Sequence, residues 1–323
     1  MMIFDGHSDL LYDVTRRRLR GERQVLERWH LDRLRRGGVE GMVLSLWTTA
    51  APGETFWEET PWGDPADAAG RTEQMLACAQ ADLAECTKIQ LVHNAAQAEE
   101  ARAQGLLYVF LGVEGMAAIG ADLAGIDRYA DAGARMGMMT WNEENLLAAG
   151  AGASPSQGLT DLGRQAVRRM EERGMLVDVS HLSDGSFADV MQIANGPVIA
   201  SHSNCRALCD VRRNLTDDQL RAIRDTGGVV GVNACPRFVH QDPEQRTAEM
   251  LARHAAHMAD VMGVEHVACG FDFCHFINPE NAVTRDLEDA SRAGELFFWL
   301  EKLGMSSRER EMVARENFLR VLA

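Results

Sequence analysis

Eight short apolar runs, each typical of a β-strand, are spread along this chain of 323 residues and alternate with helix signals. Strands that alternate with helices pair in parallel, because each helix returns the chain to the same end of the sheet. Eight such units over this length favour a (β/α)8 barrel of the TIM type, in the α/β class, over an open sheet. We expect the strands at 2–5, 39–47, 106–113, 135–140, 175–180, 197–201, 228–233 and 266–271, with an extra short strand at 89–92.

Polar residues at helix starts support this division. Thr160 stands directly before an amphipathic segment, as an N-cap residue does. Two pairs have the spacing of capping boxes, Thr216 with Gln219 and Ser306 with Glu309. No GxGxxG turn follows an early strand, so nothing indicates a dinucleotide-binding fold. We therefore expect one barrel domain over residues 1–323.

Two irregular stretches interrupt the alternation, near 51–70 and 275–290, and both are expected to be loop insertions. The first is rich in Pro, Gly and Trp and follows the second strand, which places it at the carboxyl end of the barrel. Exposed Trp side chains there could line a substrate pocket, and a packed surface loop is an equally good interpretation.

The net charge of -15 disfavours binding to nucleic acid or to an anionic membrane surface. We interpret the basic runs at 16–18 and 35–36 as solvated faces. No segment has the length of a transmembrane helix, and metal-ligand candidates that begin at residue 7 leave no room for a cleaved leader.

Seven scattered cysteines, an odd number without a dense pattern, predict reduced thiols and a cytoplasmic location. Cys205 and Cys209 have the spacing of half a zinc site. No second half stands at a suitable distance along the sequence, so we expect both thiols in the core.

Six residues that can bind metals or carry protons stand at the ends of these strands. The carboxyl ends of barrel strands meet at one face, so these side chains are expected to converge. Any one of them could simply be a hydrogen-bonded polar group at a strand end. The first strand ends in His7 and Asp9, which are two residues apart and therefore point to the same side. The third, fifth, sixth and eighth strands end in Glu114, His181, His202 and Asp272, in that order.

Three carboxylates and three imidazoles around one pocket are costly to bury unless a cation compensates their charge. This donor set suits zinc, with Mn²⁺ or Fe²⁺ as alternatives. The charge of two divalent ions is balanced by Asp9, Glu114, Asp272 and a bridging hydroxide, so we expect two Zn²⁺ per chain. Glu114, with two oxygens and glycines on either side of Val113-Glu114, is the natural bridge.

The residues around these positions resemble the membrane dipeptidase (renal dipeptidase) family, peptidase family M19, of the amidohydrolase superfamily. The matching segments run in order along the whole chain. They are Phe4-Asp5-Gly6-His7-Ser8-Asp9-Leu10, Gly112-Val113-Glu114-Gly115, Asp178-Val179-Ser180-His181, Ser201-His202-Ser203-Asn204, Arg213-Asn214-Leu215-Thr216-Asp217, Gly270-Phe271-Asp272-Phe273 and Asn317-Phe318-Leu319-Arg320-Val321.

The resemblance implies a distorted barrel with the metal-dependent hydrolase architecture and a binuclear zinc site. It implies that His7 and Asp9 bind the first zinc, that His181 and His202 bind the second, and that Glu114 bridges them. Asp272 is then the catalytic residue that moves a proton from the bridging water to the leaving amine. Arg213 is the substrate-binding residue that holds the terminal carboxylate, an arrangement that bidentate Arg–carboxylate geometry favours.

The sequence departs from the family in three places. Trp141 stands where animal members carry a His that polarises the scissile carbonyl, and Asn142 next to it could donate from its amide. We therefore count both among the candidate substrate-binding residues. Phe271 replaces a small Ser, and Cys274-His275 replace an acidic residue and Gly.

The resemblance implies a zinc metallodipeptidase that cleaves short peptides with a metal-bridging hydroxide. Dipeptides are the expected substrates, with C-terminal D residues among the candidates, and a homodimer is compatible with the family. Two alternatives stay open. One is another amidohydrolase reaction, on an N-acyl amino acid, a lactone or a phosphoester. The other is a metal-binding accessory protein with little activity.

Overall fold

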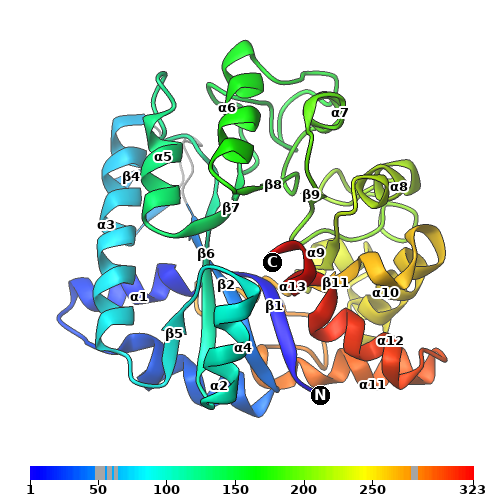
Figure 1. The fold of residues 1–323 in the computed structure, drawn as a ribbon. Coiled ribbons are helices and arrows are strands. Elements are labelled where there is room, and N and C mark those ends of the chain that lie inside the picture. The colour runs from blue at the N-terminus through cyan, green and yellow to red at the C-terminus, as the bar shows by residue number, and fades with distance from the viewer. Residues whose placement is uncertain (48–54, 57–59, 62–64, 278–282) are drawn as a thin grey trace.

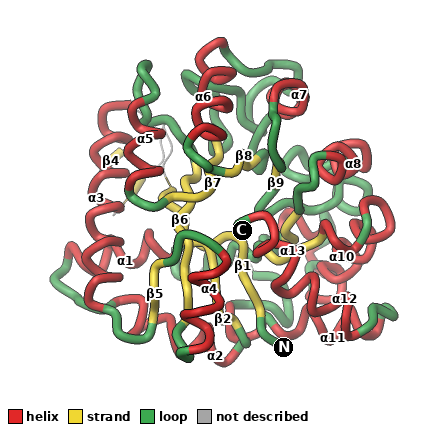
Figure 2. Tube along the Cα trace, viewed as in Figure 1, coloured by secondary structure: helices red, strands yellow, loops and turns green. Residues whose placement is uncertain are grey.

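The computed structural model describes residues 1–47, 55–56, 60–61, 65–277 and 283–323. Its main feature is a ring of parallel strands with helices around it (Figures 1 and 2). The predicted barrel is confirmed, and each predicted strand is present within a few residues of its expected bounds. Around the ring, the strands are β10 (Val230–Val232), β11 (Val267–Cys269), β1 (Ile3–Ser8), β2 (Val39–Trp47), β6 (Leu107–Glu114), β7 (Ala134–Met138), β8 (Leu176–Asp178) and β9 (Val198–Ile199).

The ring is nearly closed between β9 and β10 by a short parallel bridge just beyond β9. The backbone N–H of Ala200 donates to the carbonyl of Val229 at 3.0 Å, and that of Gly231 donates to Ala200 at 2.8 Å. Two residues of β9 are enough to bring its carboxyl end beside its neighbours. Closure matters for the site because it turns every strand end toward one axis.

The barrel is distorted at β6, where two strands share one edge. The extra strand expected at 89–92 is present as β5 (Ile89–Leu91) and pairs with the first half of β6. From Leu111 onward, the same edge of β6 pairs with β7, and the last pair is Glu114 with Met138. Strand β6 therefore ends in Glu114, which is paired on both sides, with Trp47 of β2 and with Met138 of β7.

Helices surround the strands (Figure 1). The predicted caps are confirmed: Thr160 accepts a hydrogen bond from the N–H of Gly163, and both capping boxes are present. The helices are α1 (Leu10–Leu19), α2 (Leu31–Arg36), α3 (Pro65–Glu85), α4 (Ala95–Ala103), α5 (Ala124–Asp131), α6 (Asp161–Glu172), α7 (Asp184–Ile193), α8 (Asp217–Asp225), α9 (Pro236–Val239), α10 (Ala248–Met262), α11 (Gly294–Lys302), α12 (Ser307–Glu311) and α13 (Asn317–Val321).

Shorter helical turns complete the outer layer. Two are π-helical, at Leu26–His30 and Met312–Glu316, and three are 3₁₀-helical, at Pro243–Gln245, Val264–His266 and Ala290–Arg292. Within the described ranges, no helix is both long and apolar enough to cross a bilayer.

Half of the insertion expected near 51–70 lies outside the described residues, and so do the tryptophans expected there to line a pocket. Residues 65–70 form the start of α3, so the irregular part is shorter than the sequence indicated. Before it, β3 (Thr55–Phe56) and β4 (Thr60–Pro61) pair as a small antiparallel hairpin. The second stretch contains residues 278–282, which are not described, and short bridges at Thr284 and Arg285.

Aromatic rings fill the amino end of the barrel and leave the carboxyl end for chemistry. The ring centroid of Phe4 lies 5.8 Å from that of Phe110 and 5.3 Å from that of Phe318. A Cβ atom on Gly6 would stand 2.1 Å from the Phe318 ring, so glycine is what lets α13 pack there. The C-terminus accordingly lies near the middle of the strand ring in the view of Figure 2.

The interpretation of residues 16–18 as a solvated face is wrong for Arg18. Its side chain is only 8% exposed and contacts Asp82 and Glu85, each at 2.8 Å. The buried Asp82 carboxylate also accepts hydrogen bonds from the N–H groups of Val25 and Leu26. A buried guanidinium needs such partners, and this network ties α1 to α3. The thiols of Cys205 and Cys209 are buried and free, as predicted.

His254 on α10 makes folding sensitive to acid. Its Nδ1 accepts from the N–H of Cys205 at 3.0 Å, and its Nε2 donates to the carbonyl of Val239 at 2.8 Å, so the neutral ring is fully satisfied. Burial lowers its pKa to about 4. In the unfolded chain the His254 ring gains a proton below about pH 6.5, whereas in the folded protein it stays neutral down to about pH 4. The contribution of His254 to the free energy of unfolding is therefore present above about pH 6.5 and is lost as the pH falls toward 4.

We expect metal-free wild type to lose about 2 kcal/mol more unfolding free energy between pH 7 and pH 5 than His254→Gln does. Urea unfolding in the presence of a chelator measures this difference. His240→Gln, a change at another histidine of the same region, should behave as wild type. An equal loss in wild type and His254→Gln would contradict the assignment.

Candidate metal centre

The structure brings the six predicted residues together at the carboxyl end of the barrel. His7 lies on β1 itself, which continues to Ser8, and Glu114 is the last residue of β6. None of the five predicted metal ligands is more than 6% exposed, so these are not ordinary surface charges. The remaining four follow their strands directly or within a few residues: Asp9 after β1, His181 after β8, His202 after β9 and Asp272 after β11.

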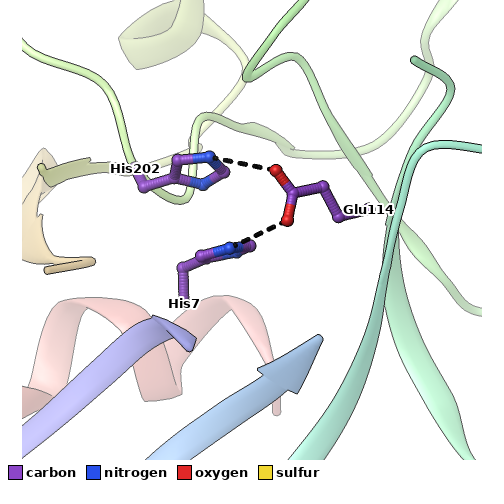
Figure 3. A group of neighbouring side chains, drawn as sticks. All are labelled: His7, Glu114 and His202. Carbon is purple, nitrogen blue, oxygen red and sulfur yellow. Dashed lines mark ion pairs between the residues drawn. The ribbon is translucent and has the colours of Figure 1, made fainter. Parts of the chain in front are cut away.

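Glu114 is the centre of the group, and its two oxygens face different partners (Figure 3). Oε2 lies 3.1 Å from Nε2 of His7, which is itself 3.5 Å from Oδ1 of Asp9. Oε1 lies 2.9 Å from Nε2 of His181 and 3.8 Å from Nε2 of His202. The carboxylate therefore stands between a His–Asp pair and a His–His pair.

The two histidines of the second pair are held in the neutral form. Their Nε2 atoms are 2.9 Å apart, too close for both to carry a proton. Burial, with nearby positive charge, lowers the pKa of each ring well below the usual value. Nδ1 of His181 donates to Oδ1 of Asn142 at 2.9 Å, and Nδ1 of His202 lies 2.8 Å from Oγ of Ser201. Such bonds fix the tautomer that leaves the Nε2 lone pair facing the centre.

Several buried polar atoms at this centre have no hydrogen bond among the described residues. They include Nε2 of His7, Oδ1 of Asp9 and Oε2 of Glu114. Potential ligand atoms of His7, Glu114 and His202 lie within 4.8 Å of one another, and so do those of His7, Asp9 and Asp272. Buried polar atoms that converge without hydrogen bonds are what a cation would satisfy, so the donor set fits a metal.

The carboxylates also show the cost of burial without a cation. Desolvation, with the charge of Asp9 nearby, raises the pKa of Glu114 to about 8 and that of Asp272 to about 6. A divalent ion at the centre would reverse this shift by favouring the ionised form.

Unusual backbone conformations aim two of these side chains. His181 has φ of 70° and Asp272 has φ of 57°, in the left-handed region that non-glycine residues rarely adopt. Asp178 at the end of β8 holds the turn of His181 and the segment after β9 in place. Its Oδ1 accepts hydrogen bonds from the N–H groups of Ser180 and Ser201 at 2.9 and 3.1 Å. Strain of this kind persists where surrounding bonds determine the conformation.

The sequence did not single out the residues that support Asp272. Nδ2 of Asn233, just after β10, donates to Oδ2 of Asp272 at 3.0 Å and lies 3.3 Å from the carbonyl of His202. The thiol of Cys274 donates to Oδ1 of Asp272 at 3.3 Å. Both oxygens of the predicted proton carrier are thus held. The signal for Asn233 was its place at the end of a predicted strand, where the other site residues stand.

The three predicted substrate-binding residues lie around this centre in different ways. Arg213 is buried, with Nη2 at 3.3 Å from the carbonyl of His202. The Trp141 ring lies 6.2 Å from the ring of His181 and is half-buried. The amide oxygen of Asn142 accepts a hydrogen bond from His181, so Asn142 supports a predicted metal ligand.

The three residues near Asp272 that depart from the family pattern, Phe271, Cys274 and His275, have different surroundings. Phe271 is fully buried in the core between strands and helices and stacks on Phe273 at 5.1 Å. His275 lies 2.6 Å from the guanidinium of Arg33, away from the carboxylate cluster. Of these residues, Cys274 is the one that contacts Asp272.

Comparison with known proteins identifies this arrangement. The sequence profile of the membrane dipeptidase family, peptidase family M19, matches residues 1–323. The chain belongs to the membrane dipeptidase family. An uncharacterized dipeptidase of Schizosaccharomyces pombe is 27% identical over 337 residues, covering 99% of this chain and 80% of that protein. An uncharacterized Klebsiella pneumoniae protein is 32% identical over 269 residues, covering 80% of this chain and 97% of that protein.

Solved structures of the family agree in fold. A Rhodobacter sphaeroides metallopeptidase, liganded with a phosphinate mimic of the dipeptide L-Ala-D-Ala, has a TM-score of 0.85 at 25% identity, covering 100% of this chain and 98% of that one. A metallopeptidase described as dipeptidase AC has a TM-score of 0.85 at 26% identity over the same shares. Membership of the membrane dipeptidase family makes this chain a hydrolase that acts on dipeptides, with the barrel of the amidohydrolases.

Proposed function

We propose that this chain is a binuclear zinc dipeptidase that hydrolyses free dipeptides, with C-terminal D residues among its substrates. One observation carries the proposal: one oxygen of Glu114 faces His7, which lies beside Asp9, and the other oxygen faces His181 and His202. A single ion on one side of Glu114 would leave the buried donor atoms on the other side without a partner. The D-residue part rests on the phosphinate mimic of L-Ala-D-Ala bound by the Rhodobacter sphaeroides relative.

In this proposal His7 and Asp9 hold one ion, His181 and His202 hold the other, and Glu114 bridges them. When bound, two divalent ions lower the pKa of a water molecule and polarise the carbonyl of the substrate. Imidazole and carboxylate donors suit zinc, and Mn²⁺ or Fe²⁺ would accept the same ligands.

The remaining residues handle the substrate and the proton. Arg213 presents a buried guanidinium beside His202, suited to the terminal carboxylate of a short peptide. Asp272 accepts the proton of the attacking water and returns it to the departing amine. Its orientation is maintained by Asn233 and Cys274. A free C-terminus is therefore a requirement for good substrates.

Asn142 is expected to act on metal affinity through His181. Replacing it with alanine removes the acceptor of the Nδ1 proton, and losing such a partner costs about 10- to 100-fold in affinity. Competition with a chelator measures this loss. Asn195→Ala, on an exposed turn, should keep the wild-type affinity. Unchanged affinity in Asn142→Ala would show that the contact does not support the ligand.

A stereodefined library tests the function. Zinc-loaded protein is assayed against dipeptides with L and D C-terminal residues, and against N-acyl amino acids, lactones and phosphoesters. We expect dipeptides to be hydrolysed with kcat/KM of at least about 10⁴ M⁻¹s⁻¹, and their C-terminal amides to be poor substrates. Turnover of another class with no dipeptide cleaved would overturn the proposal, and no turnover at all would favour an accessory protein.

The free state of all seven cysteines supports a reducing compartment, so we propose a cytoplasmic enzyme. The dipeptidase family supports a small peptide as its partner. The acidic charge disfavours nucleic acid and anionic membrane surfaces as partners. A homodimer stays a prediction from the family.

A further inference from the structure

Two tryptophans stand at the carboxyl end of the barrel beside the metal centre. Trp47 is the last residue of β2 and is the direct register partner of Glu114 on β6. Register partners in a parallel sheet project from the same face, so Trp47 and Glu114 lie on the same side of the barrel wall. Trp141 follows β7, with its ring 6.2 Å from that of His181. We call Trp47 and Trp141 the aromatic pair.

The aromatic pair is a packed unit. The two ring centroids are 5.7 Å apart with an interplanar angle of 63°, an edge-to-face contact. Behind them, the ring of Tyr12 on α1 lies 6.1 Å from that of Trp47 and is mostly buried. Both indoles are only half-buried, so the pair keeps accessible apolar surface next to the ligand His181.

In the ring of strands, Trp47 stands opposite Arg213, whereas Trp141, which follows β7, is two strands from β9. Arg213 belongs to the segment between β9 and β10, and β2 is four strands away from β9 in either direction around the ring. The cluster around Glu114 lies between them. A dipeptide with its carboxylate at Arg213 and its amide at the cluster therefore extends its N-terminal residue toward the aromatic pair.

We propose that the aromatic pair binds the side chain of the N-terminal residue and gives the enzyme a preference for large apolar or aromatic residues there. This inference rests on the proposed dipeptidase function. Aromatic faces gain by covering apolar side chains, and a contact of this size discriminates by about 10- to 100-fold in kcat/KM.

The test compares Phe-Xaa and Gly-Xaa dipeptides with the same C-terminal residue. In wild type, kcat/KM for the Phe substrate should exceed that for the Gly substrate by about 10- to 100-fold. Trp141→Ala should bring this ratio toward one, mainly through KM, and Trp141→Phe should restore most of it. The matched control is Trp29→Ala, because Trp29 is half-exposed and lies under the guanidinium of Arg17, 3.9 Å from its ring.

Each outcome decides the matter. A ratio unchanged in a Trp141→Ala protein of normal metal content overturns the inference, and so does a loss of the same factor on both substrates. A shift of the ratio in Trp29→Ala would overturn it as well. If wild type cleaves the Gly and Phe substrates equally well, the inference about the aromatic pair is wrong, but the proposed dipeptidase function stands. Wild type that cleaves no dipeptide sinks the proposed function, and the inference falls with it.

Discussion

Replacing Asp272 with asparagine is expected to lower kcat for dipeptide hydrolysis by about 10²- to 10⁴-fold while the metal content stays that of wild type. Asparagine cannot accept and return a proton, so the step assigned to Asp272 is lost. The fold should survive, because Asn tolerates the left-handed backbone of this position (φ of 57°) and its amide oxygen can still accept from Asn233. Turnover at saturating substrate, with metal analysis of the same sample, measures both quantities.

Asp286→Asn is the matched control for this variant. Asp286 also has a left-handed backbone, with φ of 64°, and is exposed, so the same chemical change is made in the same conformation far from any proton transfer. It should leave both kcat and metal content unchanged. A fully metallated Asp272→Asn protein with wild-type turnover would remove Asp272 from the mechanism.

Replacing Glu114 with glutamine is expected to weaken metal binding by at least about 100-fold, more than the loss of a supporting residue costs. Both donor sets around Glu114 depend on its carboxylate, since each of its oxygens faces one of them. An amide has one oxygen and no charge, so it can neither bridge two ions nor balance them. Dipeptidase activity should fall together with the metal content measured after dialysis.

The control is Glu40→Gln on β2. Glu40 is also a partly buried carboxylate, 3.4 Å from the hydroxyl of Tyr108 and 3.6 Å from Arg315, and it touches no residue of the metal centre. This variant should keep its metals and its activity. If Glu114→Gln retained two ions per chain, a bridging role for Glu114 would be excluded.

Much of this fold was predictable because the barrel strands are buried on both faces. Such strands appear in the sequence as continuous apolar runs, and the ligands at their ends converge because the strands are parallel. His7, Glu114 and His202 could therefore be grouped across nearly two hundred residues of sequence. Local chemistry at Thr216 and Ser306 likewise determined where two helices begin.

What the sequence did not reveal depends on contacts between distant segments. No local pattern indicates that Arg18 is buried against Asp82, or that β5 and β7 share one edge of β6. The same is true of the hydrogen bond from His181 to Asn142. These features belong to tertiary packing, which residue types alone do not determine.

The central claim is that two metal ions at Glu114 support dipeptide hydrolysis. Titrating metal-free protein with zinc, while bound metal and the rate of hydrolysis of an unblocked dipeptide are followed together, tests it most directly. We expect the rate to reach its maximum only when two ions are bound per chain. Full activity with one bound ion, or with none, would contradict it.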